Sequence, residues 1–452
     1  MANLLKRISN RYLRIQIGRT PQQNLFYGFL TYILVGSFLL SLPFLQKTSP
    51  SILDNIFIAT SAVSTTGLVT ISVFDTYNMG GQFIVMLLFQ IGGIGYLTFT
   101  TFMLLSTTRR ITRWHKSILS SEFTLPVTIK IKDFLKSVIL FTLIMEIIGT
   151  ILFFIAFKMN GMATGEALWN ALFHSISAFC TAGFSLFNSG FTEYVDDGFI
   201  NFIISFLAIC GSLGFIVVTD FVLWFKNKKH KLSFTTKIIL VGFLILLSFG
   251  FSFFYFFEPT VASLDGASRS YAAFFQAMTA MTTVGFNTVD FGAFAMPMLV
   301  ATVFLMYIGA SPSGTAGGMK ITTLTAVLAI MKSRLRGSKR ITFFGRKIPF
   351  ERLYIATSSF IFYTSIIFLG VFILTFTEGF NLESIIFEVA SALGTVGLSM
   401  GITGDLSSIG KIVIILLMFI GRLGVLTFGL AIWSKQASKE GEETYLEDDI
   451  AV

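Results

Sequence analysis

The sequence predicts an all-α integral membrane protein built from four tandem copies of one unit. Three observations lead to this fold class: an apolar composition with few charges, eight segments long enough to cross a bilayer, and a short pattern that occurs four times. Of the 452 residues, 54% are hydrophobic and 13% are charged, whereas an ordinary soluble domain carries about 25% charged residues. This composition excludes a large soluble enzyme and a disordered chain.

The transmembrane spans come first, because a helix needs about 20 apolar residues to cross the hydrocarbon core. Eight segments meet this requirement: residues 25–44, 80–105, 136–157, 197–225, 237–257, 297–331, 354–376 and 409–433. The first segment follows a basic tail and precedes no small-residue cleavage site, so a retained helix is expected rather than a signal peptide.

Basic residues divide the connecting loops into two sets. Of the 33 Lys and Arg residues, 27 fall in loops 1–23, 106–136, 226–237 and 332–352 and in the tail from 434. The positive-inside rule therefore predicts that both termini are cytoplasmic. These basic stretches are interpreted as juxtamembrane charges that contact anionic lipid, rather than as a site for nucleic acid.

Four short segments on the opposite side share one pattern. It consists of Phe, Ser or Thr four residues later, Ala, Thr three residues further on, any residue, Gly, and Leu or Phe. The copies are Phe57–Leu68, Phe173–Phe184, Phe275–Phe286 and Phe387–Leu398. The apolar stretch before each Thr has only about 10–14 residues, too few to cross a bilayer. Each copy therefore predicts a half-helix that enters from outside, followed by a loop buried in protein.

The predicted architecture has eight transmembrane helices and four re-entrant pore loops around one pseudo-fourfold pore, each repeat being a span, a pore helix and a span. The expected boundaries are a cytoplasmic N-terminal tail, 1–23; repeats at 24–112, 113–230, 231–345 (with a broken second span) and 346–434; and a cytoplasmic C-terminal tail, 435–452.

The loop of each repeat predicts a selectivity filter for a large monovalent cation such as K⁺. Neutral backbone carbonyls can replace the water shell of such an ion, and a glycine without Cβ permits the φ angles that aim them at the axis. The predicted ion-binding residues are Thr65, Thr66, Gly67, Thr181, Ala182, Gly183, Thr283, Val284, Gly285, Thr395, Val396 and Gly397. A single T-x-G segment would equally fit close helix packing.

Acidic residues near these loops are Asp54, Asp75, Asp290, Glu383, Glu388 and Asp405. They are expected either to raise the cation concentration at the outer mouth or simply to be solvated.

The span at 297–331 is too long for one membrane crossing. Its 35 residues would extend roughly 50 Å as a helix, against a hydrocarbon core of about 30 Å. The middle reads Gly309, Ala310, Ser311, Pro312, Ser313, Gly314, Thr315, Ala316, Gly317 and Gly318. Such residues do not sustain a helix. We expect a broken helix whose loop crosses the pore below the filter as a gate; the alternatives are a plain kink or a packing notch.

Arg422 lies within the last span, where a charge is costly and indicates function. It is expected below the filter, repelling cations and donating to carbonyls of the gate loop. The alternative is an ion pair with Glu146 or Asp220. Lys320 is interpreted as a snorkelling side chain. Glycines at 92–95, 211–214 and 421–424 predict close packing around the pore, with a hinge as the alternative.

The filter motifs S-T-T-G-L (64–68), C-T-A-G-F (180–184), T-T-V-G-F-N (282–287) and G-T-V-G-L-S (394–399) carry a family resemblance. From about Asn24 to Trp433 the chain resembles the Trk/Ktr/HKT superfamily of potassium transporters, and within it the ion-translocating subunits of Ktr systems. The resemblance implies potassium uptake across the bacterial plasma membrane, with K⁺ bound at the filter residues and Na⁺ as an activator. It also implies a homodimer, a cytoplasmic ring of nucleotide-binding (RCK/KTN-type) regulatory subunits, and no cofactor in this chain.

Two other functions are weighed against this one. An alternating-access secondary transporter of K⁺ or Na⁺ also uses broken helices, but its repeats are inverted or paired, whereas all four loops here are expected to enter from outside. An enzyme is not expected, because the sequence shows no nucleophile–base set, metal cluster or cofactor fingerprint.

Overall fold

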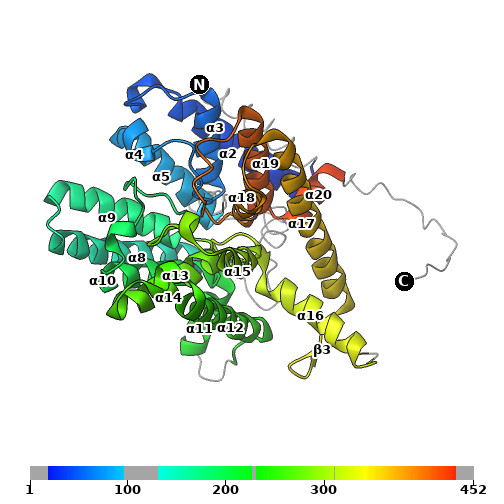
Figure 1. The fold of residues 1–452 in the computed structure, drawn as a ribbon. Helices are drawn as coiled ribbons and strands as arrows, with labels where there is room; N and C mark the ends of the chain where they lie inside the picture. Colours follow the sequence, from blue (N-terminus) through cyan, green and yellow to red (C-terminus); the bar gives the residue numbers. More distant parts are fainter. Residues whose placement is uncertain (1–18, 96–130, 227–230, 310, 339, 434–452) are drawn as a thin grey trace.

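The computed structural model describes residues 19–95, 131–226, 231–309, 311–338 and 340–433 (Figure 1). Within these residues, four helices are long and apolar enough to cross a membrane. They are α2 (Pro21–Leu40), α8 (Ile131–Met159), α12 (Phe234–Phe257) and α17 (Phe350–Thr377). Exposed apolar side chains such as Phe38, Leu244 and Phe368 cover their outer faces. This is the surface of an integral membrane protein, since hydrocarbon is the solvent that such faces require.

Each long helix is followed by a shorter, buried helix. These are α3 (Ile52–Val63), α9 (Thr164–Phe179), α14 (Gly266–Thr282) and α18 (Leu382–Gly394). Each packs against the long helix before it: α3 on α2, α9 on α8, α14 on α12 and α18 on α17. The short helices end at the T-x-G segments, because α14 and α18 are capped by Thr283 and Thr395 in the left-handed conformation.

The second predicted span of each repeat is shorter or broken. Its helices are α5 (Met79–Ile94), α10 (Gly198–Ser212) with α11 (Phe215–Lys226), α15 (Met296–Tyr307) with α16 (Ile321–Leu335), and α19 (Ser408–Leu423) with α20 (Val425–Trp433). The break in the third repeat was expected. Residues 96–105, which belong to the predicted span 80–105, lie outside the described residues.

The segments 197–225 and 409–433 are not the continuous spans that were expected, because each contains a break. The helix axes bend by 90° between α10 and α11 and by 98° between α19 and α20. The physical reason is a glycine with positive φ at each break, 88° at Gly214 and 85° at Gly424. A residue with positive φ lies outside the right-handed helical region, so the helix ends there. Gly95 has the same conformation, with φ of 86°, at the end of α5.

The remaining elements are short. They are η1 (Pro43–Leu45), α4 (Val73–Thr76), η2 (Thr192–Tyr194), α13 (Pro259–Ala262) and η3 (Phe291–Ala293), and the strands β1 (Ile308–Gly309), β2 (Met319–Lys320), β3 (Thr342–Phe343) and β4 (Arg346–Lys347). Strands β3 and β4 form an antiparallel hairpin next to α16. Strands β1 and β2 pair in parallel, with Ile308 opposite Met319. This pair closes the base of the loop between them.

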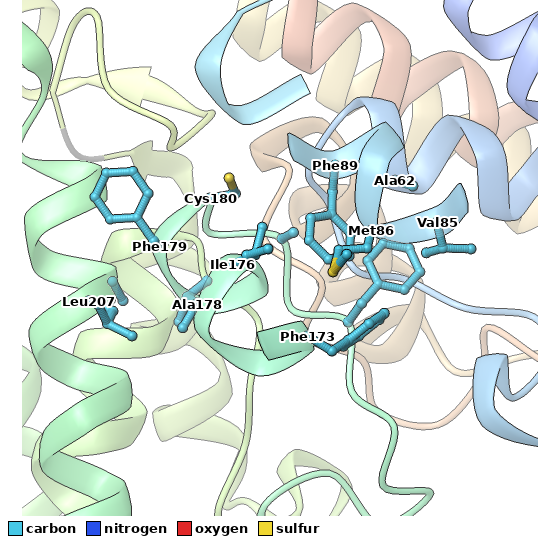
Figure 2. Close-up of a cluster of buried hydrophobic side chains, with 14 of the residues drawn as sticks. Ala62, Val85, Met86, Phe89, Phe173, Ile176, Ala178, Phe179, Cys180 and Leu207 are labelled. Atoms are coloured by element: carbon cyan, nitrogen blue, oxygen red, sulfur yellow. The ribbon is translucent and has the colours of Figure 1, made fainter. Parts of the chain in front are cut away.

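The core forms where neighbouring units meet. Figure 2 shows Phe89 of α5 beside Phe173 of α9, and their rings lie edge to face at 5.4 Å. Cys180 lies in the same cluster at the end of α9. The first and last units also meet, because α3 packs on α19 and α2 on α20 (Figure 1). The chain thereby closes on itself, although α3 ends at residue 63 and α19 begins at residue 408.

Candidate functional site

The four T-x-G segments lie against one another. A Cβ added to each filter glycine would lie within 2.6 Å of a carbonyl oxygen of the next unit. The pairs are Gly67 with Ala182 O, Gly183 with Val284 O, Gly285 with Val396 O, and Gly397 with Thr66 O. Each unit thus contacts the next, and the fourth contacts the first. All twelve residues predicted to bind the ion therefore lie in one closed ring of loops.

The threonine of each segment has an unusual backbone conformation. The φ angles are 52° at Thr65, 49° at Thr181, 57° at Thr283 and 49° at Thr395, and all four side chains are fully buried. A left-handed conformation costs a non-glycine residue about 1–3 kcal/mol and persists only where the surroundings enforce it. Its occurrence at the same position in four units indicates that the loop geometry is shared.

The Ser or Thr column of the repeat enforces that geometry. Ser61 Oγ accepts from the backbone N–H of Gly67, and Ser391 Oγ accepts from that of Gly397, both at 3.1 Å. In the other units the hydroxyl donates instead: Ser177 Oγ to Phe184 O at 2.8 Å and Thr279 Oγ1 to Phe286 O at 2.6 Å. This column is part of the repeat pattern in the sequence, but the pattern alone assigns it no role. The presence of Ser or Thr at this position in all four copies was the sequence signal that could have identified this role.

The loop between β1 and β2 lies next to the four threonines. Thr181 Oγ1 donates to Thr315 Oγ1 at 3.1 Å, and Thr65 Oγ1 lies 3.5 Å from Thr315 O. The backbone N–H of Gly317 donates to Thr283 Oγ1 at 3.2 Å. A Cβ on Gly317 would lie 1.9 Å from Thr395 Oγ1. Thr315 and Gly317 together thus contact all four units. Ala310 of the predicted gate lies outside the described residues.

The start of this loop is tied to the break in the second unit. Ser311 Oγ donates to Ser212 O at 3.1 Å, and the N–H of Phe215 donates to Ser313 O at 3.0 Å. A Cβ on Gly214 would lie 2.3 Å from Ser311 Oγ. The bend between α10 and α11 therefore makes room for the loop.

Two basic side chains, Arg422 and Lys320, donate hydrogen bonds to backbone carbonyls of the loop between β1 and β2. Arg422 donates through Nη1 to Thr315 O and through Nη2 to Gly92 O. Lys320 Nζ donates to Ala316 O and Gly317 O, both at 2.6 Å. The interpretation of Lys320 as a snorkelling residue was wrong, because its ammonium turns back to the loop, whose carbonyls are the nearest acceptors.

The acids considered as partners of Arg422 have acceptor roles elsewhere. Glu146 accepts a hydrogen bond from Gln90 Nε2 at 2.7 Å. Asp220 accepts from the backbone N–H of Ser233, also at 2.7 Å.

The glycines before the helix breaks allow close packing. A Cβ on Gly92 would lie 2.2 Å from Val63 O, one on Gly211 would lie 2.0 Å from Phe179 O, and one on Gly421 would lie 2.2 Å from Leu393 O. Each of these carbonyls belongs to the residue two positions before the filter threonine. Close packing is therefore the role of the first glycine in each cluster, while the last glycine lies where the helix ends.

A cavity of about 650 Å³ adjoins the loop. Its lining includes Gly317, Lys320 and Arg422, together with Lys347 and Arg352 of the segment predicted to be cytoplasmic. The cavity therefore extends from the loop to the segment predicted to be cytoplasmic.

Two of the acids near the loops are not free at the outer mouth. Glu388 is fully buried, and Asp54 is 8% exposed. Lys411 of α19 donates to Asp54 Oδ1 at 2.8 Å, so this ion pair joins the first unit to the fourth. Burial would raise the pKa of Asp54, but hydrogen bonds from Lys411, Ser51 and Thr70 together lower it below its ordinary 3.8.

Removing this ion pair by Lys411→Met is expected to destabilise the protein by about 1 kcal/mol at neutral pH. A carboxyl whose pKa is lowered by folding stabilises the fold above its unfolded pKa, and this stabilisation disappears as the pH falls through the folded pKa. The difference in melting temperature between wild type and variant should thus be largest at neutral pH and shrink as the pH falls below about 4. The measurement is the melting temperature of the detergent-solubilised protein across this range.

The matched control is Lys47→Met, which removes an outer cation whose ammonium donates to Phe74 O. It should leave the melting temperature close to that of the wild type. Equal shifts for both variants at every pH would contradict the role of the ion pair.

These features define a membrane cation-transport protein: a helical membrane fold, a closed ring of neutral loops, and a loop held beneath it by two cations. The family described as "TrkH: Cation transport protein" matches residues 20–440, and the chain belongs to this family. The resemblance stated from the filter motifs is confirmed.

Individual relatives agree with the family assignment. The chain is 36% identical over 415 residues to the Ktr system potassium uptake protein B of Bacillus subtilis, covering 90% of this chain and 92% of the relative. It is 33% identical over 447 residues to the potassium/sodium uptake protein NtpJ of Enterococcus hirae, covering 97% and 98%. The crystal structure of the potassium transporter TrkH from Vibrio parahaemolyticus has the same fold, with a TM-score of 0.68, 23% identity, and coverage of 90% and 84%.

Proposed function

We propose that the protein takes up potassium across the bacterial plasma membrane through a channel-like pore. The observation that carries this proposal is the closed ring of four T-x-G loops, in which each filter glycine contacts a carbonyl of the next unit. The loop cores contain no formal charge. Dehydrated K⁺ is stabilised by such neutral oxygens. The names of the Ktr relatives support the same substrate.

The loop at 311–318 is proposed as the gate. It lies against all four filter threonines, and Arg422 and Lys320 hold its carbonyls. Small residues without long side chains let such a loop move at little cost, and its base stays closed by the pairing of β1 with β2. In this proposal the two cations serve twice, since they anchor the loop and repel a cation while the pore is shut.

Control of the pore is proposed to come from other chains. Relatives belong to Ktr systems, which supports a cytoplasmic ring of nucleotide-binding subunits docked on the basic face of a homodimer. Stimulation by Na⁺ belongs to the same proposal, and a relative named for both potassium and sodium uptake supports it. Both termini are proposed to be cytoplasmic on the distribution of Lys and Arg.

The second candidate is an alternating-access secondary transporter, which the broken helices favour. The two candidates predict different fluxes. Expressed in a strain deficient in potassium uptake, the chain should restore growth at low external potassium. Reconstituted in a planar bilayer, it should give single-channel currents. Restored growth without resolvable current, and with a turnover slow enough for a conformational cycle, would favour alternating access. Failure to transport K⁺ in the presence of its regulatory subunits would contradict the proposal.

A further inference from the structure

Three of the four short helices carry a buried polar side chain at one shared position, directly after the Phe of the repeat pattern. The residues are His174, Gln276 and Glu388, and all three are fully buried. The first unit has Ile58 there. Buried polar groups are costly unless they are hydrogen-bonded. Their recurrence at one position therefore calls for an explanation. The contacts between the four T-x-G loops do not provide it, because these three side chains take no part in them.

The hydrogen bonds of all three side chains reach the segment that leaves the filter of the same unit. Glu388 accepts from Ser399 Oγ at 2.8 Å and from Thr403 Oγ1 at 2.5 Å. Gln276 Nε2 donates to Val289 O at 3.2 Å and lies 3.4 Å from Thr288 Oγ1.

The histidine makes the equivalent contact in its neutral form. His174 Nε2 accepts from the backbone N–H of Leu186 at 3.2 Å, and Nδ1 is 2.8 Å from Asn170 O. A proton on Nδ1 satisfies both contacts. Leu186 lies three residues after the filter glycine, as Thr288 does in the third unit.

The first unit reaches the same segment from a different position. Asp54, four residues before Ile58, accepts from Thr70 Oγ1 at 2.8 Å. Thr70 also lies three residues after the filter glycine. Every unit therefore fastens its filter at two points: the Ser or Thr column holds the loop itself, and a second polar side chain holds the exit segment.

We infer that these second contacts are specificity-determining, and that Glu388 is the most important of the positioning residues that make them. Glu388 differs from the others because it is an acid that binds two hydroxyl donors, four and eight residues beyond Thr395. Thr403 Oγ1 also lies 3.0 Å from Ser399 Oγ, so the three side chains form a closed triangle behind the fourth filter loop. In the size-based account of selectivity, a filter distinguishes K⁺ from Na⁺ because its carbonyls resist collapse onto the smaller ion. The triangle supplies that resistance, so this inference rests on the proposed function.

The repeat itself provides the test variants. Glu388→Ile installs the residue that the first unit has at this position, and Glu388→Gln installs that of the third. Glu388→Ile is expected to lower the ratio of apparent affinities for K⁺ over Na⁺ by about tenfold, equivalent to about 1.4 kcal/mol. Glu388→Gln should stay within about twofold of wild type, since an amide can still bond both hydroxyls. Ile58→Leu is the control at the same position in the first unit and should leave the ratio unchanged.

The readout is the KM for each ion from initial uptake rates, normalised to the amount of protein in the membrane. A purely structural role would change the maximal rate and leave the ratio of KM values constant, which would overturn the inference. If Glu388→Ile does not reach the membrane, Thr403→Val removes one hydroxyl at nearly constant volume and should lower the ratio, whereas Thr403→Ser should retain it. An unchanged ratio in Thr403→Val would also overturn the inference. Gly285→Ser distinguishes failure of the proposed filter from failure of this inference. If Gly285→Ser weakens K⁺ affinity while the Glu388 variants leave the ratio of KM values for K⁺ and Na⁺ unchanged, only the inference about Glu388 fails.

Discussion

Replacing Gly285 by serine is expected to weaken the apparent affinity for K⁺ by about tenfold or more, because two costs act together. Gly285 has φ of +82°, and an added Cβ would lie 2.2 Å from Val396 O. The left-handed strain alone amounts to about 1–3 kcal/mol. The clash must in addition displace a carbonyl that belongs to the proposed ion site. The measurement is the concentration dependence of K⁺ and Rb⁺ uptake, with Na⁺ uptake as a measure of lost selectivity.

Gly161 offers a matched control for this variant. Its φ is also +82°, but no atom lies within 4 Å of the added Cβ. Gly161→Ser therefore imposes the same backbone strain outside the ring and should leave K⁺ affinity unchanged. Equal K⁺ affinity in wild type and Gly285→Ser would refute the assignment of the filter.

Replacing Arg422 by alanine is expected to raise the maximal K⁺ uptake rate about tenfold in the absence of the regulatory subunits. Its guanidinium donates to Thr315 O of the gate loop and to Gly92 O. A hydrogen bond from a charged donor contributes about 1.5–3 kcal/mol, so its loss favours the displaced loop by tenfold or more. A cation is also removed from the path of the ion. Uptake rates at saturating K⁺ measure the effect.

Arg422→Lys separates the two causes. It retains the charge, but a single ammonium lacks the planar fork that reaches two carbonyls. If anchoring of the loop dominates, Arg422→Lys should resemble Arg422→Ala; if electrostatic repulsion dominates, it should resemble the wild type. An unchanged maximal rate in Arg422→Ala, at normal protein levels, would rule out the gate role.

Composition and segment length predict where the membrane-spanning helices lie, but not where they break. Segment 354–376 predicts a helix that the structure extends to Phe350–Thr377, since an unbroken apolar stretch has no other stable form in a bilayer. The breaks at Gly214 and Gly424 were not predicted, because a glycine within an apolar segment fits close packing as well as a bend. The bends of 90° and 98° in the structure decide between them, and at Gly214 the bend makes room for Ser311.

The site divides in a similar way. The T-x-G segments could be found because four copies share one register, which one copy alone could not reveal. The role of Lys320 could not be predicted from the sequence, because a lysine near the end of a span can turn toward either the membrane interface or the protein interior. Glu388 was recognised as an acid near the mouth, and only its contacts with Ser399 and Thr403 place it behind the filter.

The sequence by itself determined the membrane class, the four units, the positions of the T-x-G loops and the break in the third unit, because these depend on composition, length and repetition along one chain. The tertiary structure decided which atoms meet: each filter glycine with the next unit, Thr315 and Gly317 with the four threonines, and Asp54 with Lys411. Those contacts join residues from about 30 to more than 350 positions apart. Their geometry depends on how the helices pack around the axis, which no local pattern encodes.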